Sequence, residues 1–133
     1  MRIFFGIWCL LFVFSAYLQL NDPDPVAWVT IYLVAAIFSA MAAMRIYPMI
    51  PLAVAAVLSL VGVIYFFPPS VSEWVAQEWA QQDLTMKTMA MEEARESFGF
   101  LLILIVLSVA LYMGRRKKTR ITRKYGTNYL GRN

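Results

Sequence analysis

The sequence contains no histidine and a single cysteine, Cys9, in 133 residues. Histidine is the commonest metal ligand and the usual proton carrier near neutral pH. One cysteine can form neither an intramolecular disulfide nor a cysteine-rich metal site. We therefore expect no haem, no zinc site and no histidine-based hydrolytic triad, and more generally no cofactor and no enzyme activity.

Charge is also scarce, because only 15% of the residues are charged while 61% are hydrophobic. Ordinary soluble domains are about one quarter charged and about half apolar. The apolar residues occur in long runs that lack ionisable side chains, and such runs are not stable when exposed to water. The composition therefore predicts that the lipid bilayer is the solvent of this chain.

Four apolar runs are long enough to predict membrane-spanning helices, since about 20 residues of helix cross about 30 Å of hydrocarbon. A cleaved signal peptide is the alternative for the first run, but its apolar region is too long and Tyr17-Leu18-Gln19 is a poor cleavage site. The strictly apolar part of the last run is short, so we expect its helix to begin earlier, near Glu92. The predicted spans cover residues 3–20, 26–44, 48–67 and 94–113. They define an all-α integral membrane four-helix bundle over residues 1–114, followed by a basic tail over residues 115–133.

The connections carry helix-start signals. Asp24 followed by Pro25 predicts an N-cap whose carboxylate accepts a backbone N–H, with proline at the first helical position. Ser70 to Glu73 fits a capping box, and Val71, Trp74, Val75 and Trp79 then recur at helical spacing. A short amphipathic helix on the outer surface is therefore predicted between spans three and four.

The charges separate by side. All eight acidic residues lie in the two loops that share one side of a four-span chain, whereas ten of the twelve bases lie on the other side, with Lys87 and Arg95 as the exceptions. This split predicts that both termini are cytoplasmic. We expect the protein to be integral to a bacterial inner (plasma) membrane.

Polar residues at the predicted outer ends of the spans form a candidate outer-face motif. Its first part could cap a turn, contact a partner or help to bind a hard cation. Its second part is a helix start in which Arg95 pairs with a neighbouring glutamate or, alternatively, reaches Asp22 or Asp24 and closes the outer end of the bundle. The motif comprises Gln19, Asn21, Asp22, Asp24, Glu92, Glu93, Arg95 and Glu96.

Two further residue sets predict contacts. Small residues in spans two and three allow close helix packing: Ala36, Ser39, Ala40, Ala43 and Ser59. A basic cluster after span four predicts contact with anionic lipid headgroups: Arg115, Arg116, Lys117, Lys118 and Arg120. The expected partners are the bilayer and other membrane subunits or a second copy of the chain, and nucleic acid is not expected.

Two segments together resemble a known family. Residues 19–25, Gln-Leu-Asn-Asp-Pro-Asp-Pro, followed by Trp28-Val29, look like the hallmark of the transmembrane protein 220 family. Residues 92–99 resemble the charged segment that precedes the last span of that family. The resemblance implies a small multi-span membrane protein without an assigned activity, and it implies no catalytic residue. The basic tail is not part of it.

Two functions remain open from the sequence. The first is an auxiliary or scaffold subunit of a membrane assembly. The alternative is a small transporter, or a lipid- or cation-binding protein, that uses a pocket at the outer ends of the helices. No Asp, Glu, Lys or Arg lies within the middle of a predicted span, which disfavours a proton-coupled carrier.

Overall fold

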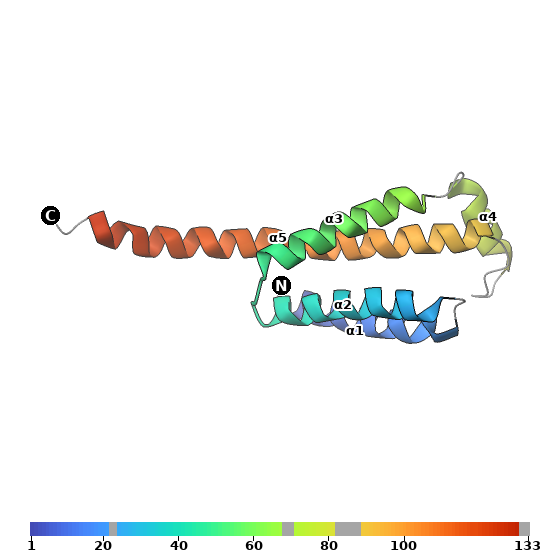
Figure 1. Cartoon of the computed structure of the whole chain (residues 1–133), viewed down its shortest axis with the longest axis horizontal. Helices are drawn as coiled ribbons and strands as arrows, with labels where there is room; N and C mark the ends of the chain where they lie inside the picture. The colour runs from blue at the N-terminus through green and yellow to red at the C-terminus, as the bar shows by residue number, and fades with distance from the viewer. Residues whose placement is uncertain (22–23, 68–70, 82–88, 131–133) are drawn as a thin grey trace. The chain divides into compact units, whose positions relative to one another are not determined.

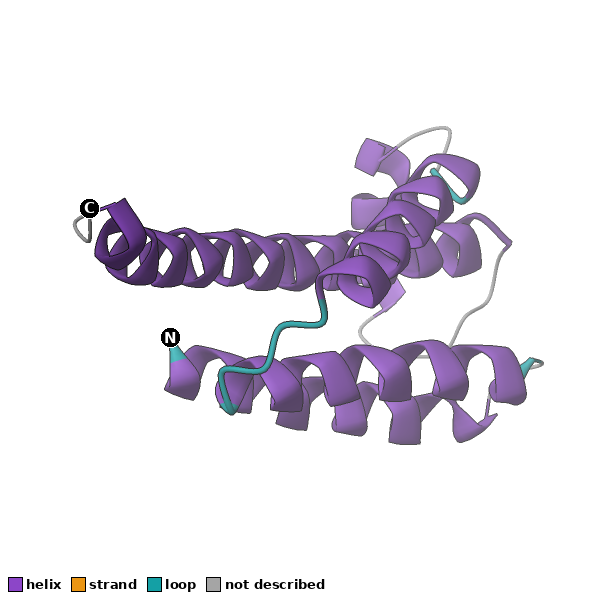
Figure 2. Ribbon diagram, turned by 60° about the vertical axis from the view of Figure 1, so that its left-hand side comes forward, coloured by secondary structure: helices purple, strands orange, loops and turns teal. Residues whose placement is uncertain are grey.

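The computed structural model describes residues 1–21, 24–67, 71–81 and 89–130. Within these residues every element is a helix, which confirms the all-α class (Figures 1 and 2). The elements are α1 (Arg2–Leu18), the 3-10 turn η1 (Gln19–Asn21), α2 (Pro25–Ala43), α3 (Met49–Tyr65), α4 (Val71–Gln81) and α5 (Met89–Leu130).

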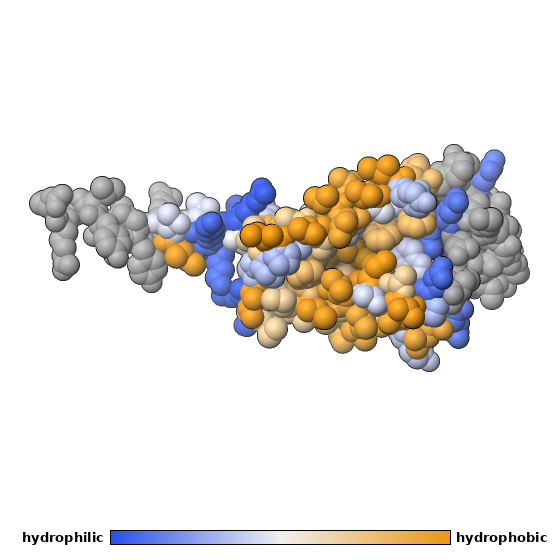
Figure 3. All heavy atoms as spheres, viewed as in Figure 1, coloured by the Kyte–Doolittle hydropathy of each residue, from blue (hydrophilic) through white to orange (hydrophobic). Residues whose placement is uncertain are grey.

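Within the described ranges, three helical segments are long and apolar enough to cross a membrane: Arg2–Asn21, Pro25–Ala43 and Glu93–Thr122. Their lipid-facing character is visible in side chains such as Ile3, which is 79% exposed, and Leu10, which is 71% exposed. On the face that Figure 3 shows, apolar residues predominate over the middle of the molecule. Water would not support so much exposed apolar surface, and the chain is an integral membrane protein.

The third predicted span corresponds to α3, which is apolar but has only 17 residues. A helix of this length rises about 26 Å, which is at the lower limit for a crossing. Phe66 and Phe67 continue the apolar run beyond its end. A fourth span, and with it the four-helix bundle, stays a prediction.

The chain forms two compact units, of which the first contains Met1–Val54 and Val106–Asn133 and the second contains Ala55–Ile105. In the first unit, α1 and α2 run side by side in opposite directions (Figures 1 and 2). Two contacts give their register: the Arg2 Nε donates to the Ala43 carbonyl at 3.0 Å, and the rings of Phe12 and Tyr32 lie 6.3 Å apart.

This register pairs large side chains with small ones. Phe5 is fully buried and is level with Ser39, which is 1% exposed. Ala16 is likewise level with the large ring of the buried Trp28. Ser39 satisfies its own hydroxyl within α2, where Oγ donates to the Ala35 carbonyl at 2.8 Å. Small residues on one helix therefore provide room for aromatic rings on the other, which allows the two helices to pack closely.

In the second unit, α3 and α5 meet at a glycine. A Cβ atom on Gly62 would lie 2.5 Å from the Phe100 ring, and Phe100 in turn stacks on Phe66 with 6.0 Å between ring centroids. The hydroxyl of the buried Ser97 donates to the Val63 carbonyl at 3.1 Å. A missing side chain and an interhelical hydrogen bond therefore contribute to the contact between α3 and α5 in this unit.

The segment between α3 and α5 contains the predicted short helix. It is α4, on which Val71, Val75 and Trp79 recur every four residues and are exposed. Such a stripe fits a helix that lies in the headgroup region. Ser70 of the predicted capping box lies outside the described residues.

Helix α2 begins where the sequence predicts, with Asp24 at the N-cap and Pro25 in the first turn. The predicted capping bond is wrong, however, because the Asp24 side chain accepts no capping hydrogen bond. Proline has no N–H and its fixed φ suits a helix start, so Pro25 favours this helix start without the carboxylate.

Helix α5 is longer than the span that it contains. It begins at Met89 and has 42 residues, which is about 63 Å of helix. The described part of the basic segment therefore continues the last helix.

Candidate functional site

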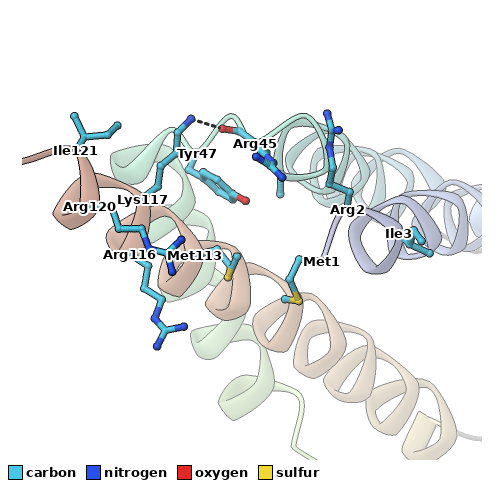
Figure 4. A pocket seen from close by; sticks show the side chains of 11 residues that line it. Met1, Arg2, Ile3, Arg45, Tyr47, Met113, Arg116, Lys117, Arg120 and Ile121 are labelled. Atoms are coloured by element: carbon cyan, nitrogen blue, oxygen red, sulfur yellow. Dashed lines mark hydrogen bonds between the residues drawn. The ribbon is translucent and has the colours of Figure 1, made fainter. Parts of the chain in front are cut away.

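A pocket of about 720 Å³ lies in the first unit, and we call it the cationic pocket (Figure 4). Five of its lining residues are basic and none is acidic. The bases are Arg2, Arg45, Arg116, Lys117 and Arg120, and the remaining lining residues are Met1, Ile3, Ala42, Tyr47, Met113 and Ile121.

One wall of the cationic pocket is a single face of α5. The wall consists of Met113, Arg116, Lys117, Arg120 and Ile121. Each has another member three or four positions away, and residues at that spacing are neighbours on a helix surface. The guanidinium of Arg116 also lies 5.0 Å from the centroid of the neighbouring Tyr112 ring, which is within cation–π range.

The opposite wall comes from the N-terminus of α1 and the C-terminus of α2 (Figure 4). The bond from Arg2 to the Ala43 carbonyl joins the two helix ends. Arg45 directly follows the C-cap residue Met44, and its guanidinium contributes to the same wall.

Arg45 has an unusual backbone. Its φ is 63°, in the left-handed region. The N–H of Ile46 donates to the Met41 carbonyl at 2.8 Å, and the N–H of Arg45 donates to the Ala42 carbonyl at 3.0 Å. These two bonds are the Schellman ending of a helix, in which glycine is the preferred residue at the left-handed position. A residue with a Cβ in this conformation costs about 1–2 kcal/mol.

Two contacts join the walls. The Lys117 Nζ donates to the Arg45 carbonyl at 3.0 Å. A Cβ on Gly114 would lie 2.6 Å from Met49 Sδ and 2.8 Å from Tyr47 Cβ, so the absence of a side chain there lets the α2–α3 connection approach α5. The cationic pocket is therefore held in shape by contacts that involve no ligand.

The chemistry of the cationic pocket is that of an anion site with an apolar border. Arginine offers a planar fork of donors that matches phosphate oxygens, and five cations without an acid create a positive potential. Met1, Ile3 and Ile121 are exposed beside these charges. An anion with a hydrocarbon portion would place its charge among the bases and its hydrocarbon against the apolar border.

The structure divides the predicted lipid-contact residues. Arg116, Lys117 and Arg120 line the cationic pocket, whereas Arg115 and Lys118 are exposed and do not line it. Sequence reasoning did not assign Arg2 and Arg45 to this site. The one signal in the sequence was the charge split, which predicts these two arginines on the same side of the membrane as the basic residues of α5. Sequence spacing could not group them, because residues 2, 45 and 116 are far apart in the chain.

The candidate outer-face motif is distributed over both units. Gln19 is half-buried at the end of α1, and Asn21 and Asp24 are exposed. Asp22 and the side chain of Glu92 lie outside the described residues. Glu93, Arg95 and Glu96 are half-buried near the start of α5 in the second unit. An approach of the two parts stays a prediction.

Among the described residues, the surface near Asp24 offers a single acid to a cation. A shallow hollow there is lined only by neighbouring residues of the α2 start, from Asp24 to Ile31, and Asp24 is its sole acid. Across residues 1–21, 24–67, 71–81 and 89–130, no group of three or more His, Cys, Asp or Glu side chains is placed to hold a metal ion.

The small residues predicted for helix packing are covered to different degrees. Ala36, Ser39 and Ser59 are buried, whereas Ala40 and Ala43 are half-buried. Ala36, at 3% exposure, is already enclosed by its own chain. Contact with a second chain through these residues stays a prediction.

Comparison with known proteins gives one family and no individual relative. No curated protein and no solved structure matches the chain. The model of the family described as Transmembrane family 220, helix, matches residues 11–112. That range includes Arg45 and Tyr47 and ends before the basic face of α5. The match covers most of the chain, which belongs to the transmembrane protein 220 family.

Proposed function

We propose that this small membrane protein is a non-catalytic, anionic-lipid-binding protein that serves as an auxiliary or scaffold subunit of a membrane assembly. The observation that supports lipid binding most directly is the cationic pocket, with five bases, no acid and exposed apolar side chains at its border. Basic pockets at the ends of membrane helices are suited to anionic headgroups.

The location of the bases supports a lipid as the anion. Met113 is the last apolar residue of the predicted fourth span, and Arg116 lies one helical turn beyond it. This position is where lipid headgroups meet a membrane helix. In the predicted topology the pocket faces the cytoplasmic leaflet, whose surface is negative. The cytoplasmic side and the bacterial inner membrane stay predictions.

The auxiliary role is the first of the two functions that the sequence leaves open, and the transporter is the second. Small residues let the helices of this chain pack closely: Ala35 and Ala36 in α2 and Gly62 in α3. Such close packing suits a small, compact subunit. The transporter hypothesis placed its pocket at the outer ends of the helices, whereas the cationic pocket lies at their opposite, predicted cytoplasmic ends. We therefore favour the subunit role.

Thermal unfolding of the purified protein tests lipid binding. A ligand that binds only the folded state raises the melting temperature with its concentration. Added phosphatidylglycerol should therefore stabilise the protein more than added phosphatidylcholine. The double variant Arg116→Gln/Arg120→Gln should lose most of this difference.

The control is Arg115→Gln/Lys118→Gln, which removes the same charge from residues of α5 that do not line the pocket. It should keep most of the difference between the two lipids. Equal losses in both double variants would contradict a localised site, and no stabilisation by phosphatidylglycerol would contradict lipid binding altogether.

A further inference from the structure

The bases of the cationic pocket stand on two walls. Arg2 and Arg45 come from the ends of α1 and α2, whereas Arg116, Lys117 and Arg120 come from α5 (Figure 4). A single phosphodiester carries one negative charge and can supply an anion to only one of the two walls. Two phosphates joined by a short linker would supply an anion for each wall.

The two walls contact each other before any ligand binds. Lys117 of the α5 wall donates to the Arg45 carbonyl of the other wall at 3.0 Å, and within that other wall Arg2 donates to the Ala43 carbonyl at 3.0 Å. Both bonds lie within the first unit. Because the walls already contact each other, a ligand with two phosphates reaches both of them without first bringing them together, which favours binding. Its second phosphate then binds at a high effective concentration.

Arg45 is the residue whose presence local structure does not explain. Its left-handed conformation, with φ of 63°, favours glycine. The two Schellman bonds at this position are made by backbone groups, so glycine would make them equally well. Strained residues concentrate at functional sites, and here the strained residue brings a guanidinium to the pocket wall.

We propose that the cationic pocket selects a lipid headgroup with two phosphates on a short linker, as in cardiolipin, and that Arg45 determines this preference. The inference rests on the proposed function and deepens it, since it names the class of lipid. The apolar border of Met1, Ile3 and Ile121 identifies the ligand as a lipid, because a soluble diphosphate has no hydrocarbon to place there.

The test is a lipid titration of the full-length, delipidated protein in detergent, with bound lipids counted by native mass spectrometry. Cardiolipin is compared with phosphatidylglycerol at equal phosphate concentration. The wild-type protein should bind cardiolipin about tenfold more tightly. Inorganic diphosphate is added as a soluble competitor and should displace little cardiolipin.

Arg45→Gly is the decisive variant. It should reduce the preference for cardiolipin about fivefold, since it removes one base from the site. It should not lower the melting temperature of the lipid-free protein, because glycine suits the left-handed position. Arg45→Lys should keep part of the preference. Arg115→Gln, which removes a base outside the pocket, should keep nearly all of it.

The outcomes separate this inference from the proposed function. Equal binding of cardiolipin and phosphatidylglycerol would overturn the two-phosphate preference while leaving anionic-lipid binding intact. An unchanged preference in Arg45→Gly would overturn the role of Arg45. Displacement of cardiolipin by an equal concentration of diphosphate would show that the ligand is soluble. Binding of neither anionic lipid above phosphatidylcholine would contradict the proposed function itself.

Discussion

At the scale of single residues, packing requires glycine at residue 62, whereas residue 45 has a backbone that favours glycine but is an arginine. Gly62 is glycine because the Phe100 ring occupies the space in which a Cβ would lie. Arg45 is not glycine although its φ of 63° favours one. Packing explains the first position, and the chemistry of the cationic pocket explains the second. The local sequence predicts neither position. Gly62 lies in an ordinary apolar run. A Schellman ending is usually recognised by its glycine, and residue 45 is an arginine.

Gly62→Ala should destabilise the protein. The added Cβ would lie 2.5 Å from the Phe100 ring, whose other neighbour is the stacked ring of Phe66. Overpacking of this kind costs about 1–3 kcal/mol of the free energy of unfolding. Unfolding monitored by circular dichroism in detergent would measure the loss.

The matched control is Gly6→Ala, because nothing lies within 4 Å of a Cβ built on Gly6. The same substitution there should be neutral or stabilising by up to about 1 kcal/mol, as expected for alanine in a helix. Similar effects at both glycines would show that helix propensity, and not the contact with Phe100, determines the result.

At the scale of elements, the apolar runs predict the helices because length and hydropathy are local properties. The ends of α1 and α2 fall within a few residues of the predicted spans, and the proline at residue 25 marks the start of α2 as expected. The capping role of Asp24 was mispredicted because the side-chain geometry at a helix start depends on the neighbouring connection. The cationic pocket was not predicted because it needs the ends of α1 and α2 beside an internal segment of α5, which only the tertiary structure brings together.

Ala36→Leu should weaken the packing of α1 against α2. Ala36 is 3% exposed, and a larger side chain there must displace the neighbouring helix. We expect a loss of about 1–3 kcal/mol in the free energy of unfolding. Ala27→Leu is the control, since Ala27 belongs to the same helix but is exposed. It should have almost no effect in the same unfolding assay, and an equal loss would contradict the assigned interface.

The burial of Ala36 within the chain also affects how self-association is tested. A change in oligomeric state after Ala36→Leu would be ambiguous, because the substitution acts on the fold of the chain itself. Mass determination of particles extracted gently at native expression is more direct. A stoichiometric complex with other chains would support the subunit role, whereas a lone monomer would contradict it.

At the scale of the whole molecule, the central prediction is the topology. The sequence places Asp24 outside and Lys118 inside, because acids and bases separate between the two sides. The single native cysteine makes this testable, since Cys9→Ser provides a cysteine-free background. In intact cells, a membrane-impermeant maleimide should label Asp24→Cys at once.

Lys118→Cys should be labelled only after the membrane is permeabilised. Both positions are exposed, so protection reports the side of the membrane and not burial in the protein. Labelling of both cysteines from the same side would contradict an arrangement in which an odd number of spans separates them.

The most direct test of the account is photocrosslinking from inside the cationic pocket. A photoreactive phenylalanine analogue replaces Tyr47, which lines the pocket, or Ile50, which lies three residues further along the chain and is 79% exposed without lining it. The bilayers contain phosphatidylglycerol and phosphatidylcholine, which are photoinert and carry distinguishable labels. The analogue at residue 47 should crosslink mainly to phosphatidylglycerol. The double variant Arg116→Gln/Arg120→Gln should abolish that preference. Residue 50 should capture both lipids in proportion to their abundance. If residue 47 also captured them in proportion, the cationic pocket would not be an anionic-lipid site.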